Sequence, residues 1–231
     1  RPMDNCTMVG FRKQIQEARK EGYNIPVERT IFMTGMAEDE WWVNMSRVSG
    51  VDATDPDQYT YGEDLAIRLN KEIASYLKAY IPGFENAYMD RVAPFMGIRE
   101  TRRLVGEYVL TEQDIFDCAK FDDAIAVSAY PVDQHHPVGG DCTLMWCPDC
   151  HDIPYRSLLP KKIDSLIVAG RCLSATHLAL ASVRVMGPAM ATGEAAGKAA
   201  ALSIKHNVQL RDLDVAALQQ ALREEGVYFR D

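Results

Sequence analysis

Three arginines and one glutamate lie within seven residues, in the stretch GIRETRR at 97–103. A guanidinium is suited to fixing a carboxylate or stabilising an enolate-like oxyanion, so Arg99 and Glu100 are candidate catalytic residues. A surface cluster of ion pairs is the alternative interpretation. His177 follows a glycine turn in the stretch CLSATHLALAS, where an imidazole can serve as an acid, a base or a hydrogen-bond donor. A purely structural histidine is the alternative there.

A second chemical pattern is CPDCH at residues 147–151, which has the spelling of a c-type haem attachment site. It also resembles a redox CxxC or half of a zinc site, with Cys142 as a nearby third sulfur. Covalent haem would require export and an axial partner, for which nothing in the sequence argues. A four-ligand zinc site is stereochemically possible with Cys142, Cys147, Cys150 and His151.

A third pattern covers residues 165–203, which indicate a short apolar strand, a glycine turn, a polar loop and a helix of small residues. Gly170 lets the backbone approach another group closely, and Arg171 offers several donors to an anion. Pro188 suits the first turn of the helix, whose N-terminus projects positive potential. The order of these features is typical of a site for a planar, anionic cofactor. A close-packed core helix without a ligand is the alternative.

The elements that must position these residues follow from hydrophobic periodicity and from turn signals. Helices are expected at residues 8–20, 63–80, 188–205 and from a cap at Asp212 or Asp214 to Leu222. Strands are expected at residues 31–34, 42–48, 91–98, 104–110, 124–129 and 163–169. Residues 49–60 are expected to form a loop and 131–154 an irregular segment, while Thr111 can cap a short helical turn. The mixture predicts an α+β fold with a mixed sheet in the middle of the chain.

Several longer stretches resemble the FAD-dependent oxidoreductases related to fumarate reductase and succinate dehydrogenase flavoproteins. They extend from about Trp42 to Leu202 and recur in the order of that family. The stretches are VNMSRVSGVDATDP, YIPGFENA, GIRETRRLVGEYVLTEQD, DIPYRSLLPKKIDSLIVAGR, and AGRCLSATHLALASVRVM followed by GEAAGKAAAL. The resemblance implies a dehydrogenase-type flavoprotein that binds FAD and transfers a hydride between a small organic substrate and the flavin.

The resemblance also implies roles for individual residues. Arg99, with Glu100 beside it, would orient or polarise the substrate, and His177 would transfer a proton. The helix after Gly187 would stabilise the reduced flavin. The residues expected near the isoalloxazine are Gly170, Arg171, Ser182, Val183, Arg184, Val185 and Met186.

In that family a glycine-rich turn near the N-terminus seats the pyrophosphate, but the sequence contains no Gly-x-Gly-x-x-Gly. The resemblance therefore implies the C-terminal portion of an enzyme whose intact fold is α/β. Residues 1–160 would form a substrate or cap domain, and residues 161–231 the C-terminal strand–helix part of a Rossmann-like FAD domain. The missing N-terminal half would be a partner. A non-catalytic interaction module, a zinc-binding module and a homodimer remain alternatives.

Composition narrows the class of protein further. The net charge of −8 argues against nucleic-acid binding by phosphate neutralisation. No apolar run approaches the roughly 20 residues of a membrane-spanning helix. Six cysteines in 231 residues do not indicate a disulfide-stapled miniprotein, so a reducing, cytoplasmic environment is expected.

Overall fold

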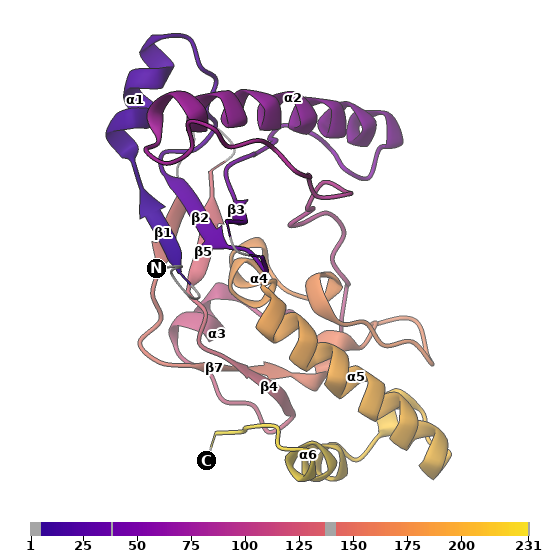
Figure 1. The fold of residues 1–231 in the computed structure, drawn as a ribbon. Helices are drawn as coiled ribbons and strands as arrows, with labels where there is room; N and C mark the ends of the chain where they lie inside the picture. The colour runs from indigo at the N-terminus through magenta and orange to yellow at the C-terminus, as the bar shows by residue number, and fades with distance from the viewer. Residues whose placement is uncertain (1–5, 38, 137–141, 231) are drawn as a thin grey trace. The chain divides into compact units, whose positions relative to one another are not determined.

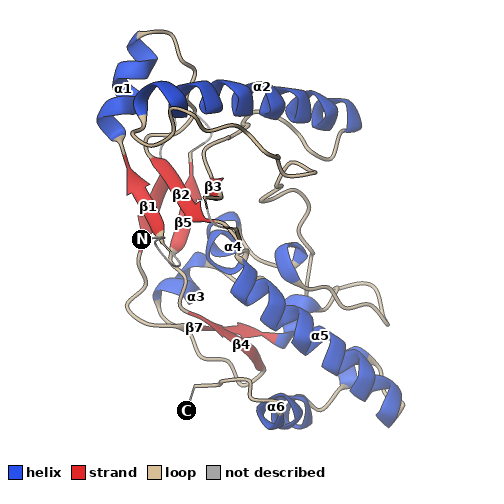
Figure 2. Cartoon of the chain, viewed as in Figure 1, coloured by secondary structure: helices blue, strands red, loops and turns tan. Residues whose placement is uncertain are grey.

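A computed structural model of the chain describes residues 6–37, 39–136 and 142–230. The chain divides into two compact units, residues 1–98 with 135–141 and residues 99–134 with 142–231. Helices combine with small, separate sheets, which confirms the predicted α+β class (Figure 2). The sequence analysis expects a boundary near residue 160, between a substrate domain and an FAD domain. This division differs from the two compact units and stays a prediction.

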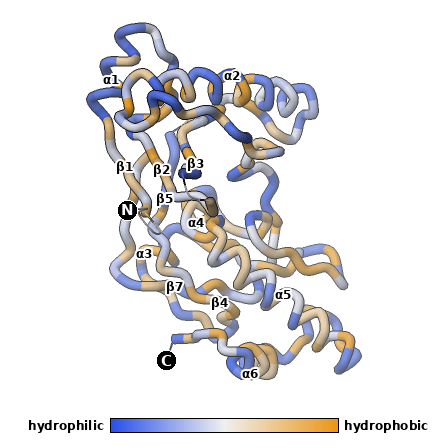
Figure 3. Tube along the Cα trace, viewed as in Figure 1, coloured by the Kyte–Doolittle hydropathy of each residue, from blue (hydrophilic) through white to orange (hydrophobic). Residues whose placement is uncertain are grey.

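The first unit holds a three-stranded antiparallel sheet and two helices (Figure 1). The strands pair in the order β1 (Thr7–Gly10), β2 (Thr30–Thr34) and β3 (Trp41–Val43). The helices are α1 (Arg12–Lys20) and α2 (Pro56–Tyr80). Hydrophilic and hydrophobic residues alternate along α2, as expected of a helix with one buried face (Figure 3).

Aromatic packing forms the core of this first unit. Phe32 is fully buried and stacks on Phe84 with ring centroids 5.0 Å apart. Tyr76 from α2 is also fully buried, and its hydroxyl lies 3.2 Å from the hydroxyl of Thr30 on β2. The pair satisfies two buried polar groups and ties the helix to the sheet.

Helix α2 begins earlier than the sequence analysis expects. The carboxylate of Asp55 accepts hydrogen bonds from the backbone N–H groups of Asp57 and Gln58, and Pro56 occupies the first helical position. Both features favour a helix start. The expectation of a loop through residue 60 is therefore wrong at its C-terminal end.

The second unit contains the remaining elements. They are α3 (Glu112–Phe116), β4 (Ala124–Ser128), β5 (Val132–His135), β6 (Cys142–Met145), β7 (His151–Pro154), α4 (His177–Val183), α5 (Met186–His206) and α6 (Val215–Glu224), with the short 3-10 helices η1 (Tyr155–Leu158), η2 (Gly170–Cys172) and η3 (Leu210–Asp212). The last residue of β5, His135, is assigned to the first unit. Strands β4 and β7 pair antiparallel, β5 pairs with β6, and α5 packs against β4. The predicted cap of α3 is confirmed, because Thr111 and Asp114 form a reciprocal capping box.

Four expectations for the middle of the chain are wrong. Residues 91–98 and 163–169 form no strand, and residues 104–110 make only isolated bridges at Gly106 and Leu110. Apolar runs become strands only where a neighbouring strand completes the hydrogen-bond ladder. Residues 131–154, expected to be irregular, carry β5, β6 and β7. In the part of the chain that the structure describes, no helix is both long and apolar enough to cross a bilayer.

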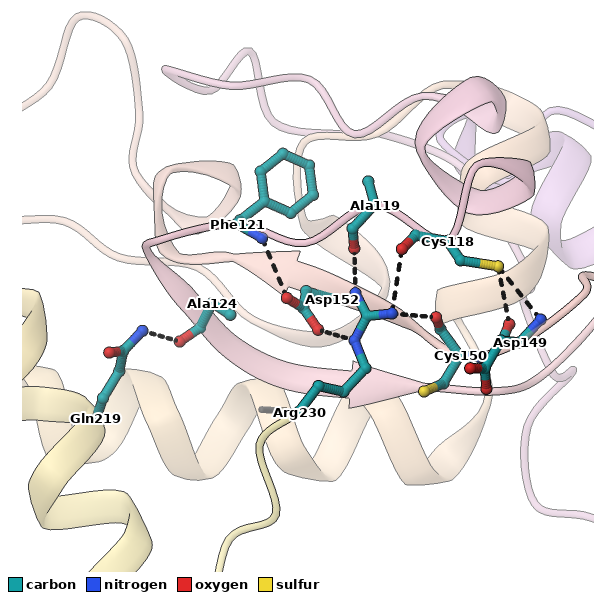
Figure 4. Close-up of polar contacts among 9 residues, drawn as sticks. All are labelled: Cys118, Ala119, Phe121, Ala124, Asp149, Cys150, Asp152, Gln219 and Arg230. Atoms are coloured by element: carbon teal, nitrogen blue, oxygen red, sulfur yellow. Dashed lines mark hydrogen bonds and ion pairs between the residues drawn. The ribbon is translucent and has the colours of Figure 1, made fainter.

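Arg230 organises one edge of the second unit (Figure 4). Its Nε lies 2.8 Å from Oδ1 of Asp152 on β7, and only 9% and 6% of the two side chains are exposed. The guanidinium also donates to the backbone oxygens of Cys118, Ala119 and Cys150. The second oxygen of Asp152 accepts from the N–H of Phe121 at 3.1 Å. One buried ion pair thus joins residues 118–121, strand β7 and the segment after α6.

Candidate active site

Two segments of the second unit carry the predicted catalytic residues, and the structure brings them together. Nδ1 of His177 lies 2.5 Å from Oε2 of Glu100. The other oxygen of Glu100 lies 3.1 Å from Nε of Arg103. Arg103 also donates to the backbone oxygen of Ala175 at 2.6 Å, which fastens residues 99–103 to the loop before α4. Glu100 therefore orients the imidazole while it is itself held by a guanidinium.

The local sequence explains the position of His177. The side chain of Thr176 caps α4 by accepting from the N–H of Ala179, and its hydroxyl donates to Glu112 at 2.7 Å. His177 is consequently the first residue of a helix and not part of a loop. Its side chain is 59% exposed. A carboxylate on Nδ1 favours the tautomer with the proton there, which leaves Nε2 for a reacting group.

A second charged group is centred on the carboxylate of Asp133. One nitrogen of Arg184 (Nη2) donates to both the carboxylate and the backbone oxygen of Asp133, at 3.0 Å each. Nη1 of Arg99 lies 3.6 Å from the same carboxylate. Arg184 and Asp133 are nearly buried, whereas about half of Arg99 is exposed. Asp133 lies 51 residues from Arg184, so no local pattern could have paired them.

The predicted cofactor segment places a glycine turn beside a helix N-terminus. Gly170 has a φ of +69°, a conformation that favours glycine, and a Cβ added there would lie 3.8 Å from the side chain of Ala189 in the first turn of α5. Arg171 follows it and is exposed. Val185 supplies no side-chain cap to α5, and the first turn holds no acidic residue. The positive end of this helix therefore lies beside the turn at Gly170, and Arg171 is the next residue along the chain.

The remaining predicted cofactor residues divide into buried and exposed ones. Val183 is fully buried, and Ser182 donates from its hydroxyl to the backbone oxygen of Tyr130 at 2.6 Å. Their side chains serve packing. Met186, the first residue of α5, is 76% exposed.

The exposed side of α5 is unusual for a helix in a folded unit. Met186, Met190 and Ile204 are mostly exposed, and between them lie the exposed glycines Gly193 and Gly197. A Cβ added at either glycine would meet nothing within 4 Å. Glycine inside a helix costs about 1 kcal/mol relative to alanine. Nothing in the described packing offsets that cost, and only the two glycines leave room for close approach by another backbone. These five residues are called the α5 face.

The cysteine–histidine pattern does not assemble into a metal site. Among the residues that the structure describes, no three of Cys142, Cys147, Cys150 and His151 bring their ligand atoms within 4.8 Å of one another. His151 is fully buried on β7, and neither ring nitrogen has a hydrogen-bond partner in the described chain. Burial, assisted by the charge of Arg230, lowers the pKa of His151 to about 4. Burial also raises the pKa of the Cys147 thiol. The zinc site expected from these four residues therefore gains no support. Cys142 instead has its sulfur within 4.8 Å of possible ligand atoms of Asp133 and His135.

The N-terminus of α5 and the exposed Arg171 both follow or adjoin the glycine turn, and both are groups that attract anions. The chain matches the family model of FAD dependent oxidoreductases over residues 3–222. It therefore belongs to this family, and a flavin-linked redox function with FAD as cofactor comes with that membership. No curated protein and no solved structure matched the chain. The closer relation to fumarate reductase stays a prediction.

Proposed function

We propose that the intact protein transfers a hydride between a small organic substrate and FAD, with Glu100 and His177 managing the accompanying proton. The observation that carries this proposal is the 2.5 Å contact between Nδ1 of His177 and Oε2 of Glu100. A carboxylate in that position fixes the orientation of the ring and accepts a hydrogen bond from Nδ1 when that nitrogen carries the proton. The side chain of His177 is 59% exposed, and Nε2 is the ring nitrogen left for a substrate atom.

The donors present on the chain suit the ring end of a flavin. When bound, FAD accepts or supplies the hydride. The residues that would hold it are Gly170, Arg171 and Arg184, together with the first turn of α5. The uncapped N–H groups of that turn and the exposed guanidinium of Arg171 would attract the electron-rich edge of a flavin ring.

Arg99 is the proposed substrate-binding residue. About half of its side chain is exposed, and it immediately precedes Glu100 in the sequence. A guanidinium there can bind a carboxylate or polarise a carbonyl on the substrate. Arg103, which holds Glu100 and the backbone oxygen of Ala175, has a positioning role instead.

The α5 face supports a further part of the proposal. We expect the remainder of the cofactor domain, including the glycine-rich turn that seats the pyrophosphate, to pack on this face. Gly193 and Gly197 would allow the close approach, and the exposed methionines would become buried. The same surface favours a second candidate function, a non-catalytic interaction module, in which a partner covers α5 without any flavin.

The visible absorption spectrum of the full gene product separates the two functions. Bound oxidised flavin supports the enzyme, and its absence after reconstitution with FAD contradicts it. In a flavin-containing protein, small carboxylates and carbonyl compounds would be screened for flavin reduction or reoxidation. His177→Gln should then lower turnover by about 10²–10⁴-fold. Glu100→Gln should lower it less and change the pH profile. The exposed His206→Gln serves as the control and should leave turnover unchanged.

A further inference from the structure

Arg184 occupies a two-residue link between helices. It follows Val183, the last residue of α4, and precedes Val185, the N-cap of α5. Only 12% of its side chain is exposed, and its guanidinium is directed to Asp133 by the two 3.0 Å hydrogen bonds. The orientation of this cation is therefore determined by one acid from β5.

The pair also controls how much positive charge the link carries. Helix α5 begins two residues after Arg184, and its N-terminus carries the equivalent of about half a positive charge. A neighbouring guanidinium would add a full charge to it. The carboxylate of Asp133, with 11% of its side chain exposed, offsets that charge in a weakly screened environment. Arg184 is its nearer cation, at 3.0 Å, and Nη1 of Arg99 lies 3.6 Å from the same carboxylate.

We propose that Asp133 is a positioning residue that lowers the reduction potential of the flavin by orienting and neutralising Arg184. The inference rests on the proposed function, in which the ring of FAD lies at the N-terminus of α5. Two-electron reduction with uptake of one proton leaves the flavin one negative charge richer. Positive charge beside the ring would favour that reduced form, and the carboxylate of Asp133 offsets the positive charge of Arg184.

The test is the midpoint potential of the FAD-reconstituted gene product carrying Asp133→Asn. Asparagine keeps the side-chain oxygen and the backbone acceptor but removes the charge. The equilibrium constant for flavin reduction should rise about tenfold, which is about 30 mV for a two-electron couple. Arg184→Gln should shift the potential in the opposite direction. The double variant should return close to the wild-type value if the two residues act as a pair.

Asp152→Asn is the matched control, because Asp152 forms an equally buried pair with Arg230. Asp152→Asn should lower the stability of the protein without changing the midpoint potential. If Asp133 had only a structural role, Asp133→Asn would give that same result. An unchanged potential in a folded, FAD-containing Asp133→Asn protein overturns the inference and leaves the proposed function intact. If Asp133→Asn does not fold, an Arg184→Gln protein with no fall in potential overturns it. Failure of the wild-type protein to bind FAD overturns both.

Discussion

His151 offers a direct test of the folded core of the second unit. The ring is fully buried, its nitrogens lack hydrogen-bond partners in the described chain, and its pKa is lowered to about 4. An unfolded chain would protonate the same ring near its ordinary value of 6.5. The folded protein should therefore lose stability in acid, because the unfolded state binds a proton that the folded state excludes.

The magnitude follows from the two pKa values. The stability contribution of the neutral ring is fully present above pH 6.5 and decreases as the pH falls toward 4. A difference of about 2.5 pKa units corresponds to about 3 kcal/mol in the free energy of unfolding. His151→Leu removes the titrating group and replaces it with an apolar side chain. This variant should lose about 3 kcal/mol less than the wild type between pH 7 and pH 4.

The assay is urea unfolding followed by circular dichroism at several pH values in that range. The slope of unfolding free energy against pH is the decisive quantity, since it does not depend on how well leucine fills the site. His206→Gln, at the exposed end of α5, should keep the wild-type slope. Identical slopes for His151→Leu and wild type would show that this ring is solvated or partnered in the folded state, and would refute the reasoning.

Further predictions concern stability alone and can be measured by urea unfolding at pH 7. Asp152→Ala should destabilise the protein by about 3–5 kcal/mol, because it leaves the guanidinium of Arg230 buried without its partner; a loss below 1 kcal/mol would contradict the network in Figure 4. Gly106→Ala should destabilise by about 1–3 kcal/mol, since the added Cβ would lie 2.6 Å from Cβ of Ser174. Gly193→Ala, where the added Cβ meets nothing, should instead stabilise α5 by about 1 kcal/mol. Thr111→Ala should cost about 1 kcal/mol through loss of the α3 capping box, and no change would indicate that tertiary packing alone holds this turn.

Local signals allowed several elements to be predicted from the sequence. The capping box at Thr111 and the cap at Asp214 involve groups two or three residues apart, so both can be recognised as local motifs in the sequence. Helix α5 was found within a few residues of its ends because small residues and a following polar segment mark it. Asp55-Pro56 is a helix-start signal, but the acidic and turn-forming residues before it also favour a loop, so the sequence alone does not locate the start of α2.

Long-range pairing could not be predicted in the same way. The apolar runs at 104–110 and 163–169 have strand composition, but strand formation depends on partners that a single sequence does not identify. The candidate site shows the same limit. Glu100 and His177 were each singled out, yet their contact spans 77 residues. Asp133 stood within a segment without periodicity, and only the fold reveals that Arg184 turns toward it.

The α5 face has a consequence for handling the protein under oxidising conditions. Met186 and Met190 are about three-quarters exposed, so peroxide should convert both thioethers to sulfoxides readily. The fully covered Met45 in the first unit should resist the same treatment. Because each sulfoxide is polar, oxidation would weaken the binding of an apolar partner to the α5 face. Mass spectrometry of methionine oxidation thus gives a label-free record of whether α5 is covered, with Met45 as the internal reference.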